Sequence, residues 1–157
     1  MRRSIQHIHL FKYAFIWLVY MLAYSPYSLA TNYFIDSVSG RDENRGTSKQ
    51  SAFKSLSKIN SLTLHPGDSI FFRRGGSWTG QLNITHSGTF GKPIVFTAYS
   101  DGPDPIIKNP GVEYGSAINI TADWVVVEYF LVREAHESGV FIRRGADHNI
   151  VRHIAAT

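Results

Sequence analysis

Short apolar runs separated by turn residues are the feature that most constrains how this chain can fold. From residue 70 onward, runs of two or three hydrophobic residues alternate with segments rich in Gly, Pro, Asp and Ser. This pattern predicts short β-strands, and no helical spacing of apolar residues follows residue 60. The predicted strands are residues 70–72, 82–84, 94–96, 106–107, 118–120, 125–127, 130–132, 140–142 and 150–151. Many short strands without crossover helices leave three folds to consider: a sandwich, a barrel or a solenoid.

An internal repeat favours the solenoid. Residues 118–120 align with residues 140–142 after a shift of 22 positions. Phe130 aligns with Ile154 after a shift of 24. Counting back a further 22 residues from Ile118 reaches Phe96, which lies in another of the predicted strands. A period in the low twenties is typical of stacked coils, and the scarcity of two-residue hairpin turns favours parallel strands over a meander.

One helix is predicted, over residues 51–60. Ser51 is a candidate N-cap, and Phe53, Leu56 and Ile59 recur at three-residue spacing with polar residues between them. One face of this helix is therefore apolar. We expect these three side chains to be buried against the first predicted strands.

The first thirty residues have the three parts of a secretory signal peptide. A basic start is followed by an uncharged apolar run over residues 13–23 and by small residues ending at Ala30. The alternative is an uncleaved anchor helix, but the run is shorter than the roughly 20 residues that span a bilayer, and Pro26 interrupts it. We expect cleavage after Ala30. The mature chain, residues 31–157, would then be secreted (extracellular, periplasmic or at the cell surface), with no stable membrane anchor.

Charge and cysteine content exclude several classes of function. The net charge is +4, but three of the basic residues lie in the predicted signal peptide and precede every acidic residue. The remaining chain is close to neutral and its basic residues are not clustered, which argues against nucleic acid as a partner. The chain has no cysteine, so neither disulfides nor thiol chemistry can occur.

Five motifs in a fixed order resemble the N-terminal region of secreted right-handed parallel β-helix proteins of the pectate-lyase-like superfamily. The motifs are residues 33–36, 40–48, 53–56, 64–72 and 75–80. The resemblance extends over residues 33–157 and implies an all-β fold, a right-handed parallel β-helix (solenoid) whose first coil is covered by the short helix over residues 51–60. Such a cover protects the open end of a solenoid. Tyr129 is a departure, because a glycine is expected after the preceding Val-x-Val-Glu strand.

The resemblance also implies a class of function. We expect the N-terminal part of a secreted carbohydrate-active protein that acts on polysaccharide, as a lyase or a glycoside hydrolase, with a glycan as its partner and a monomeric state. The family's catalytic residues lie on more central coils, none can be matched here, and we expect this piece to be inactive alone. Calcium as a cofactor stays open for the full-length protein. The alternative is a non-catalytic, adhesin-like or glycan-binding β-helix protein.

Two patterns could suggest metal sites, and neither predicts one. Asp42, Asn44 and Gly46 alternate as in a calcium loop, but Phe53 stands where an EF-hand would need its final glutamate. A loop held by side-chain turns at Asp and Asn is the favoured interpretation. His136-Glu137 begins like a zinc-protease motif, but the second histidine is missing.

The candidate substrate-binding residues surround the predicted strand at 140–142. On a strand neighbouring side chains alternate between faces, so Phe141 should point outward, directly beside Asn119 of the preceding repeat. An outward aromatic ring near carboxylate and guanidinium groups could hold a sugar. The candidate residues are His136, Glu137, Phe141, Arg143 and Arg144. The alternative is that Phe141 packs under a loop and the two arginines belong to a solvated turn.

Overall fold

A computed structural model describes residues 29–110 and 115–157. The predicted signal peptide lies outside the described residues except for its last two positions. The structure is mostly β, with two short helices. The elements are β1 (Asn32–Ile35), the 3₁₀-helix η1 (Lys49–Ser51), α2 (Leu56–Asn60), β2 (Ser69–Arg73), β3 (Ser77–Thr79), β4 (Leu82–Ile84), β5 (Ile94–Tyr99), β6 (Ile106–Lys108), β7 (Ile118–Ile120), β8 (Val125–Arg133), β9 (Val140–Ile142) and β10 (Ile150–Ala156).

The strands form two sheets, and every pairing between named strands in the described part of the chain is parallel. The larger sheet has the order β1-β2-β5-β8-β6-β3, with β10 paired to β8, and the smaller sheet has the order β4-β7-β9. Strand neighbours in each sheet are therefore far apart in sequence. The prediction of parallel stacking rather than a meander is confirmed.

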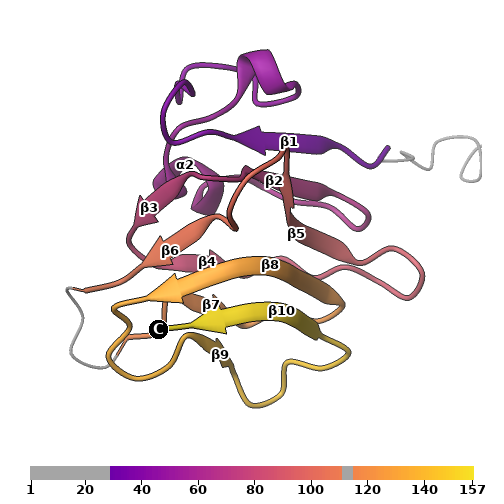
Figure 1. The fold of residues 1–157 in the computed structure, drawn as a ribbon. Coiled ribbons are helices and arrows are strands. Elements are labelled where there is room, and N and C mark those ends of the chain that lie inside the picture. Colours follow the sequence, from indigo (N-terminus) through magenta and orange to yellow (C-terminus); the bar gives the residue numbers. More distant parts are fainter. Residues whose placement is uncertain (1–28, 111–114) are drawn as a thin grey trace, which may run out of the picture.

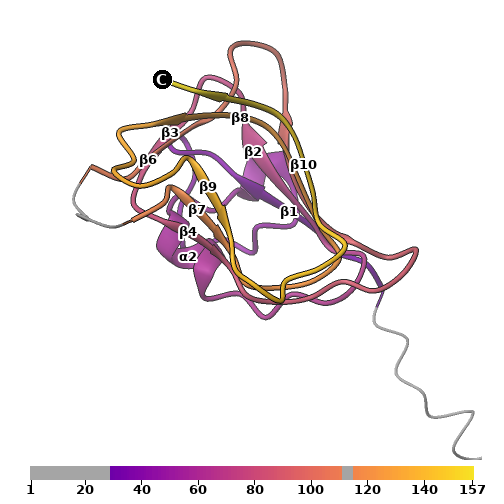
Figure 2. The same ribbon diagram turned by 90° about the horizontal axis from the view of Figure 1, so that it is seen from below.

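The chain passes through the same strand positions repeatedly, in stacked layers (Figure 1). We call β2, β3 and β4 the first layer, β5, β6 and β7 the second, β8 and β9 the third, and β10 the fourth. The single strand β8 serves two positions, because its first part pairs with β5 and its last part with β6. Seen along the stack, the strands of successive layers lie over one another and the larger sheet curls (Figure 2).

The strand register tests the predicted repeat. Ile118 pairs with Val140 and Phe130 pairs with Ile154, so the shifts of 22 and 24 are confirmed. The backward shift of 22 to Phe96 is wrong, because Ile118 pairs instead with Leu82, 36 residues earlier. The second layer is longer because six residues separate β5 from β6 and nine separate β6 from β7, whereas three and two residues separate the corresponding strands of the first layer. The period therefore varies between layers, which a fixed shift cannot follow.

Alternating side chains build one core between the sheets. The inward positions of successive layers supply three large aromatic residues with no more than 1% exposure, Phe72, Phe96 and Phe130. The rings of Phe72 and Phe130 meet edge to face with centroids 4.9 Å apart, and Phe72 also contacts Trp78 in this geometry. Edge-to-face contact is a favourable arrangement of aromatic rings, so the pair of Phe72 and Phe130 helps to join the first layer to the third inside the core.

The predicted helix is shorter than expected, and its N-cap is Ser55 rather than Ser51. The Ser55 hydroxyl accepts a hydrogen bond from the amide of Lys58, and α2 begins at Leu56. Phe53 is held outside the helix because its amide donates to the carbonyl of Phe34 as in a strand. The expected burial is confirmed, since Phe53, Leu56 and Ile59 are each 5% exposed or less. They belong to the same buried cluster as the first-layer strands.

None of the helices among the described residues combines the length and the apolar character that crossing a membrane would require.

Candidate functional site

The predicted neighbours Asn119 and Phe141 belong to a column of aligned residues on the smaller sheet. Asn83, Asn119 and Phe141 are in register on β4, β7 and β9. The side-chain amide of Asn119 donates to the side-chain oxygen of Asn83 at 3.3 Å, so the asparagines support each other along the column. Phe141 pairs with Asn119 as predicted, but exposure does not distinguish the two faces of β9, because Phe141 and Ile142 are both 43% exposed.

The other four predicted binding residues lie on the two segments that flank β9. His136 and Glu137 are in the loop before the strand, Arg143 and Arg144 are in the turn after it, and all four are exposed. The amide of Arg143 donates to the carbonyl of Ile120, which ties the turn to the layer above. Within residues 29–110 and 115–157, no side-chain hydrogen bond or ion pair joins these residues. Their grouping into one binding site stays a prediction.

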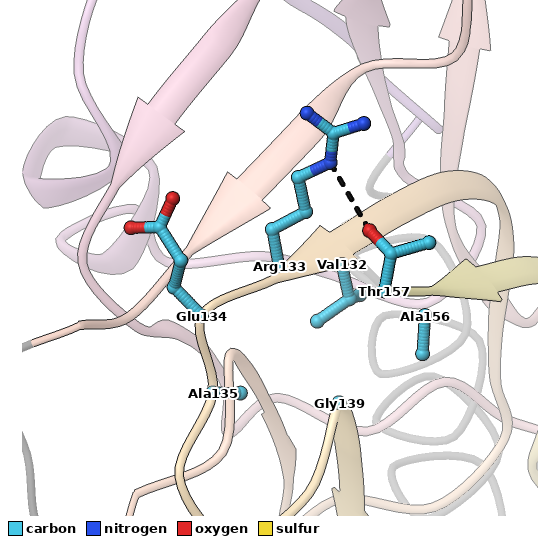
Figure 3. A pocket seen from close by; sticks show the side chains of 7 residues that line it. All are labelled: Val132, Arg133, Glu134, Ala135, Gly139, Ala156 and Thr157. Carbon is cyan, nitrogen blue, oxygen red and sulfur yellow. Dashed lines mark hydrogen bonds between the residues drawn. The ribbon is translucent and has the colours of Figure 1, made fainter.

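A hollow of about 390 Å³ lies where β8 ends and β9 begins (Figure 3). Its volume falls within the range common for small-ligand sites. Its lining combines apolar and charged groups, as Figure 3 shows. The lining residues are Val132, Arg133, Glu134, Ala135, Gly139, Ala156 and Thr157.

Charged side chains surround this hollow. Glu134 has a carboxylate oxygen 3.4 Å from the ammonium of Lys108, and the Arg133 Nε donates to the Thr157 hydroxyl at 3.2 Å. A second hollow beside it shares Glu134 and contains His136. The two hollows together present a carboxylate, an imidazole and a guanidinium, which are donors and acceptors for the hydroxyls of a polar ligand.

Of the charged residues that line the two hollows, the sequence pattern named His136 but missed Arg133 and Glu134, and the predicted Glu137 lines neither hollow. Both missed residues directly follow the apolar part of β8, where the chain leaves the sheet. Glu134 has a φ of 55°, a left-handed conformation that residues other than glycine adopt infrequently. A charged pair immediately after a strand is the signal that could have drawn attention to them.

The calcium-like loop is held by contacts with a distant segment of the chain rather than by the local side-chain turns that the sequence suggested at Asp42 and Asn44. The Asp42 carboxylate accepts hydrogen bonds from the amides of Lys54 and Ser55 and from the Ser55 hydroxyl. Burial opposes ionisation of Asp42, but these hydrogen bonds outweigh it and lower its pKa. Gly46 is required because a side chain there would overlap the ring of Phe53. Among the described residues, no cluster of three or more His, Asp or Glu could hold a metal ion.

Asp36 is the other carboxylate held by several partners. It accepts hydrogen bonds from the amides of Val38 and Ser39 and from the guanidinium of Arg73 at 2.7 Å. Its burial opposes ionisation, but these partners together lower its pKa. Burial, assisted by the charge of Asp36, raises the pKa of the Tyr99 hydroxyl. Through these bonds the Asp36 carboxylate joins the turn that follows β1 to Arg73 of β2, which is a structural role.

Comparison with known proteins points to glycan-active enzymes. No family model matches the chain. A lacto-N-biosidase from Bifidobacterium longum subsp. longum is 37% identical over 92 residues, which cover 55% of this chain and 6% of that protein. The native crystal structure of a GH136 lacto-N-biosidase from Eubacterium ramulus matches with a TM-score of 0.60 and 27% identity, over 71% of this chain and 21% of that chain.

A rhamnogalacturonan lyase matches with a TM-score of 0.63 and 20% identity, over 76% of this chain and 34% of that chain. At this identity the match shows a shared fold only. In all three comparisons the match covers about a third or less of the length of the other protein.

Proposed function

We propose that this chain is the N-terminal part of a secreted glycoside hydrolase built on a right-handed parallel β-helix. The observation that carries the proposal is the 37% identity to a lacto-N-biosidase, in a chain whose strands stack in parallel layers. The lacto-N-biosidase of known structure, at 27% identity, supports the same class of enzyme.

The layered topology supports the β-helix. Strands of the first, second and third layers pair with their counterparts at all three strand positions. Such a solenoid is defined by a chain whose successive layers place parallel strands over one another at the same positions. The short helix α2 covers the first layer at β4, where the Asn60 side chain bonds the backbone of Gln81 and Asn83.

Hydrolysis is favoured over elimination as the reaction. The lyase match has 20% identity and supports the fold alone, whereas the biosidase matches have 37% and 27%. Hydrolysis of a glycosidic bond needs two carboxyl groups on opposite sides of that bond. We assign no residue of this chain to either role.

In this proposal the described residues serve as scaffold and as a surface for glycan contact. The hollow beside Glu134 lies where the chain enters β9, and Phe141 is an exposed residue of that strand. Sugar hydroxyls would bond Glu134, His136 and the arginines after β9, and the Phe141 ring would contact an apolar face of the sugar.

Sugar release separates the proposal from its alternatives. The experiment compares this chain with a longer polypeptide that continues into further layers, on lacto-N-biose-containing oligosaccharides and on rhamnogalacturonan. We expect release of lacto-N-biose by the longer polypeptide and none by the chain alone. Unsaturated products from rhamnogalacturonan would assign a lyase instead. Binding without turnover by the longer polypeptide would favour the adhesin-like alternative.

A further inference from the structure

Phe90 is exposed in a way that the fold does not explain. It lies at the tip of the loop before β5, which projects beyond the strands in Figure 1, and its side chain is 85% exposed. The tip is a closed turn, because Thr89 and Lys92 exchange backbone hydrogen bonds of 3.1 and 2.9 Å. The ring is therefore held outward by an ordered backbone and contributes almost nothing to the core.

The loop is clamped to the turn that precedes β8. The amide of Gly88 donates to the carbonyl of Asp123 at 3.0 Å. A side chain at Gly88 would lie only 2.5 Å from the carbonyl oxygen of Trp124 and 2.7 Å from Pro93. The position of Phe90 relative to Trp124 is fixed by this close backbone contact.

Three rings from three separate turns form a continuous surface. Phe90 meets Trp124 edge to face with centroids 5.6 Å apart. Trp124 in turn stacks on His148, with centroids 4.1 Å apart and an angle of 7° between the rings. We call Phe90, Trp124 and His148 the ring surface.

The backbone beneath two of these rings is strained. Trp124 has a φ of 56° and His148 a φ of 59°, and the left-handed region costs a non-glycine residue about 1 kcal/mol or more. Glycine would fit these turns without that cost, yet large rings occupy both. The same backbone conformation and the same stacking recur at Tyr129 and His153, so what sets Trp124 and His148 apart is the exposed ring of Phe90 beside them.

Charges of both signs lie near the ring surface: Lys92 is exposed in the turn that carries Phe90, and two aspartates lie beside Trp124 and His148. Asp123 and Asp147 directly precede Trp124 and His148, and the Asp147 amide donates to the Asp123 carboxylate at 2.7 Å. Two carboxylates repel an acidic sugar such as a uronate. Aromatic rings contact the apolar C–H faces of neutral pyranoses, and carboxylates accept hydrogen bonds from their hydroxyls.

We propose that the ring surface of Phe90, Trp124 and His148 is a binding site for neutral pyranose glycans, separate from the hollow beside β9. The choice of ligand class rests on the proposed function. Phe90 supplies the exposed platform, Trp124 and His148 hold it in place, and Asp123 and Asp147 exclude acidic sugars.

Fluorine NMR tests the site directly. Two of the three tryptophans, Trp78 and Trp124, lie in the mature chain of residues 31–157, so labelling that chain with 5-fluorotryptophan gives two signals, and the Trp124→Phe variant identifies the signal of Trp124. The probes are lacto-N-biose as the neutral sugar and trigalacturonate as the acidic one. We expect lacto-N-biose to shift the Trp124 signal in a saturable manner and trigalacturonate to leave it unchanged.

A matched pair of variants separates the ring from general surface effects. Phe90→Ala should weaken lacto-N-biose binding about tenfold without lowering the melting temperature, because the side chain is not buried. Val38→Ala is the control, since Val38 is also exposed, at 76%, but lies in the loop after β1. It should leave binding unchanged.

Three results would overturn the proposal: a Trp124 signal that does not respond to lacto-N-biose, equal binding by Phe90→Ala, or an equal response to trigalacturonate. Failure of the proposed function is seen separately. If lacto-N-biose shifts the Trp124 signal but the longer polypeptide hydrolyses no glycan, the binding site is supported and the proposed hydrolase function is wrong. If the longer polypeptide hydrolyses glycans but the Trp124 signal does not respond to lacto-N-biose, the hydrolase function is supported and the proposed binding site is wrong.

Discussion

At the scale of single residues, Tyr129 shows how a side chain can replace an expected glycine. Its φ of 62° places it in the left-handed region where glycine is favoured. The bend in β8 is retained because the ring stacks on His153, with centroids 4.7 Å apart, and lies under the guanidinium of Arg74. His153 has the same backbone conformation one layer further on. Ring stacking between layers therefore offsets the backbone strain.

The strain at Tyr129 can be measured with two substitutions. Tyr129→Gly and Tyr129→Ala both remove the ring, but only alanine keeps the unfavourable backbone conformation. We expect the glycine variant to be more stable than the alanine variant by about 1 kcal/mol in urea unfolding.

The same two substitutions at Val126 provide the matched control. Val126 also lies on β8, but it is not among the residues with a positive φ. There the order should reverse, because glycine weakens a strand interior relative to alanine by roughly 0.5–1 kcal/mol. The same order of stabilities at both positions would contradict the assigned role of the backbone at Tyr129.

At the scale of elements, the short helix α2 depends on its neighbours for its existence. A five-residue helix is too short to be stable alone. The Ser55 hydroxyl caps it and also donates to the Asp42 carboxylate, so the loop after β1 and the helix hold each other. The side chains of Leu56 and Ile59 then fix it on the core.

Introducing a charge on the buried face of α2 should therefore remove the cover from the first layer. We expect Leu56→Asp to lower the free energy of unfolding by about 3 kcal/mol or more, since apolar burial is lost and a carboxylate is desolvated. Ser57→Asp is the control, because Ser57 is exposed and an acidic residue is favourable in the first helical turn.

Thermal unfolding followed by circular dichroism, together with light scattering, measures both variants. Leu56→Asp should melt earlier and aggregate, whereas Ser57→Asp should resemble the unmodified chain. Equal melting temperatures and solubility for the two variants would show that α2 does not cover the core.

At the scale of the whole molecule, stability depends on contacts between neighbouring layers. The strand β5 lies between β2 and β8, whereas β10 pairs only with β8 and β9 only with β7 in the described structure. Apolar side chains on these outer strands are half exposed, among them Ile142 and Ile150. In a stack of this kind each layer is stabilised mainly by its neighbours.

Hydrogen exchange should reveal this gradient. We expect the amides of β9 and β10 to exchange at least about tenfold faster than those of β5 and the first part of β8. The comparison of β7 with β9 is an internal control, because both belong to the smaller sheet and differ in the number of paired neighbours. Uniform protection across the layers would contradict a stack stabilised by neighbour contacts.

The sequence alone predicted the features that depend on local pattern. Strand positions follow from runs such as residues 118–120, because alternating burial leaves a direct mark on composition. The parallel pairing of β7 with β9 followed from the repeat, and with it the position of Phe141 beside Asn119.

Only the tertiary structure decided the features that depend on contacts between distant segments. The N-cap moved to Ser55 because Phe53 pairs with β1, and the partner of Ile118 became Leu82 because the second layer is longer. The hollow beside Glu134 and the ring surface of Phe90, Trp124 and His148 each combine segments that no local pattern relates. Layer lengths set which side chains meet, and those lengths are fixed only when the strands pair.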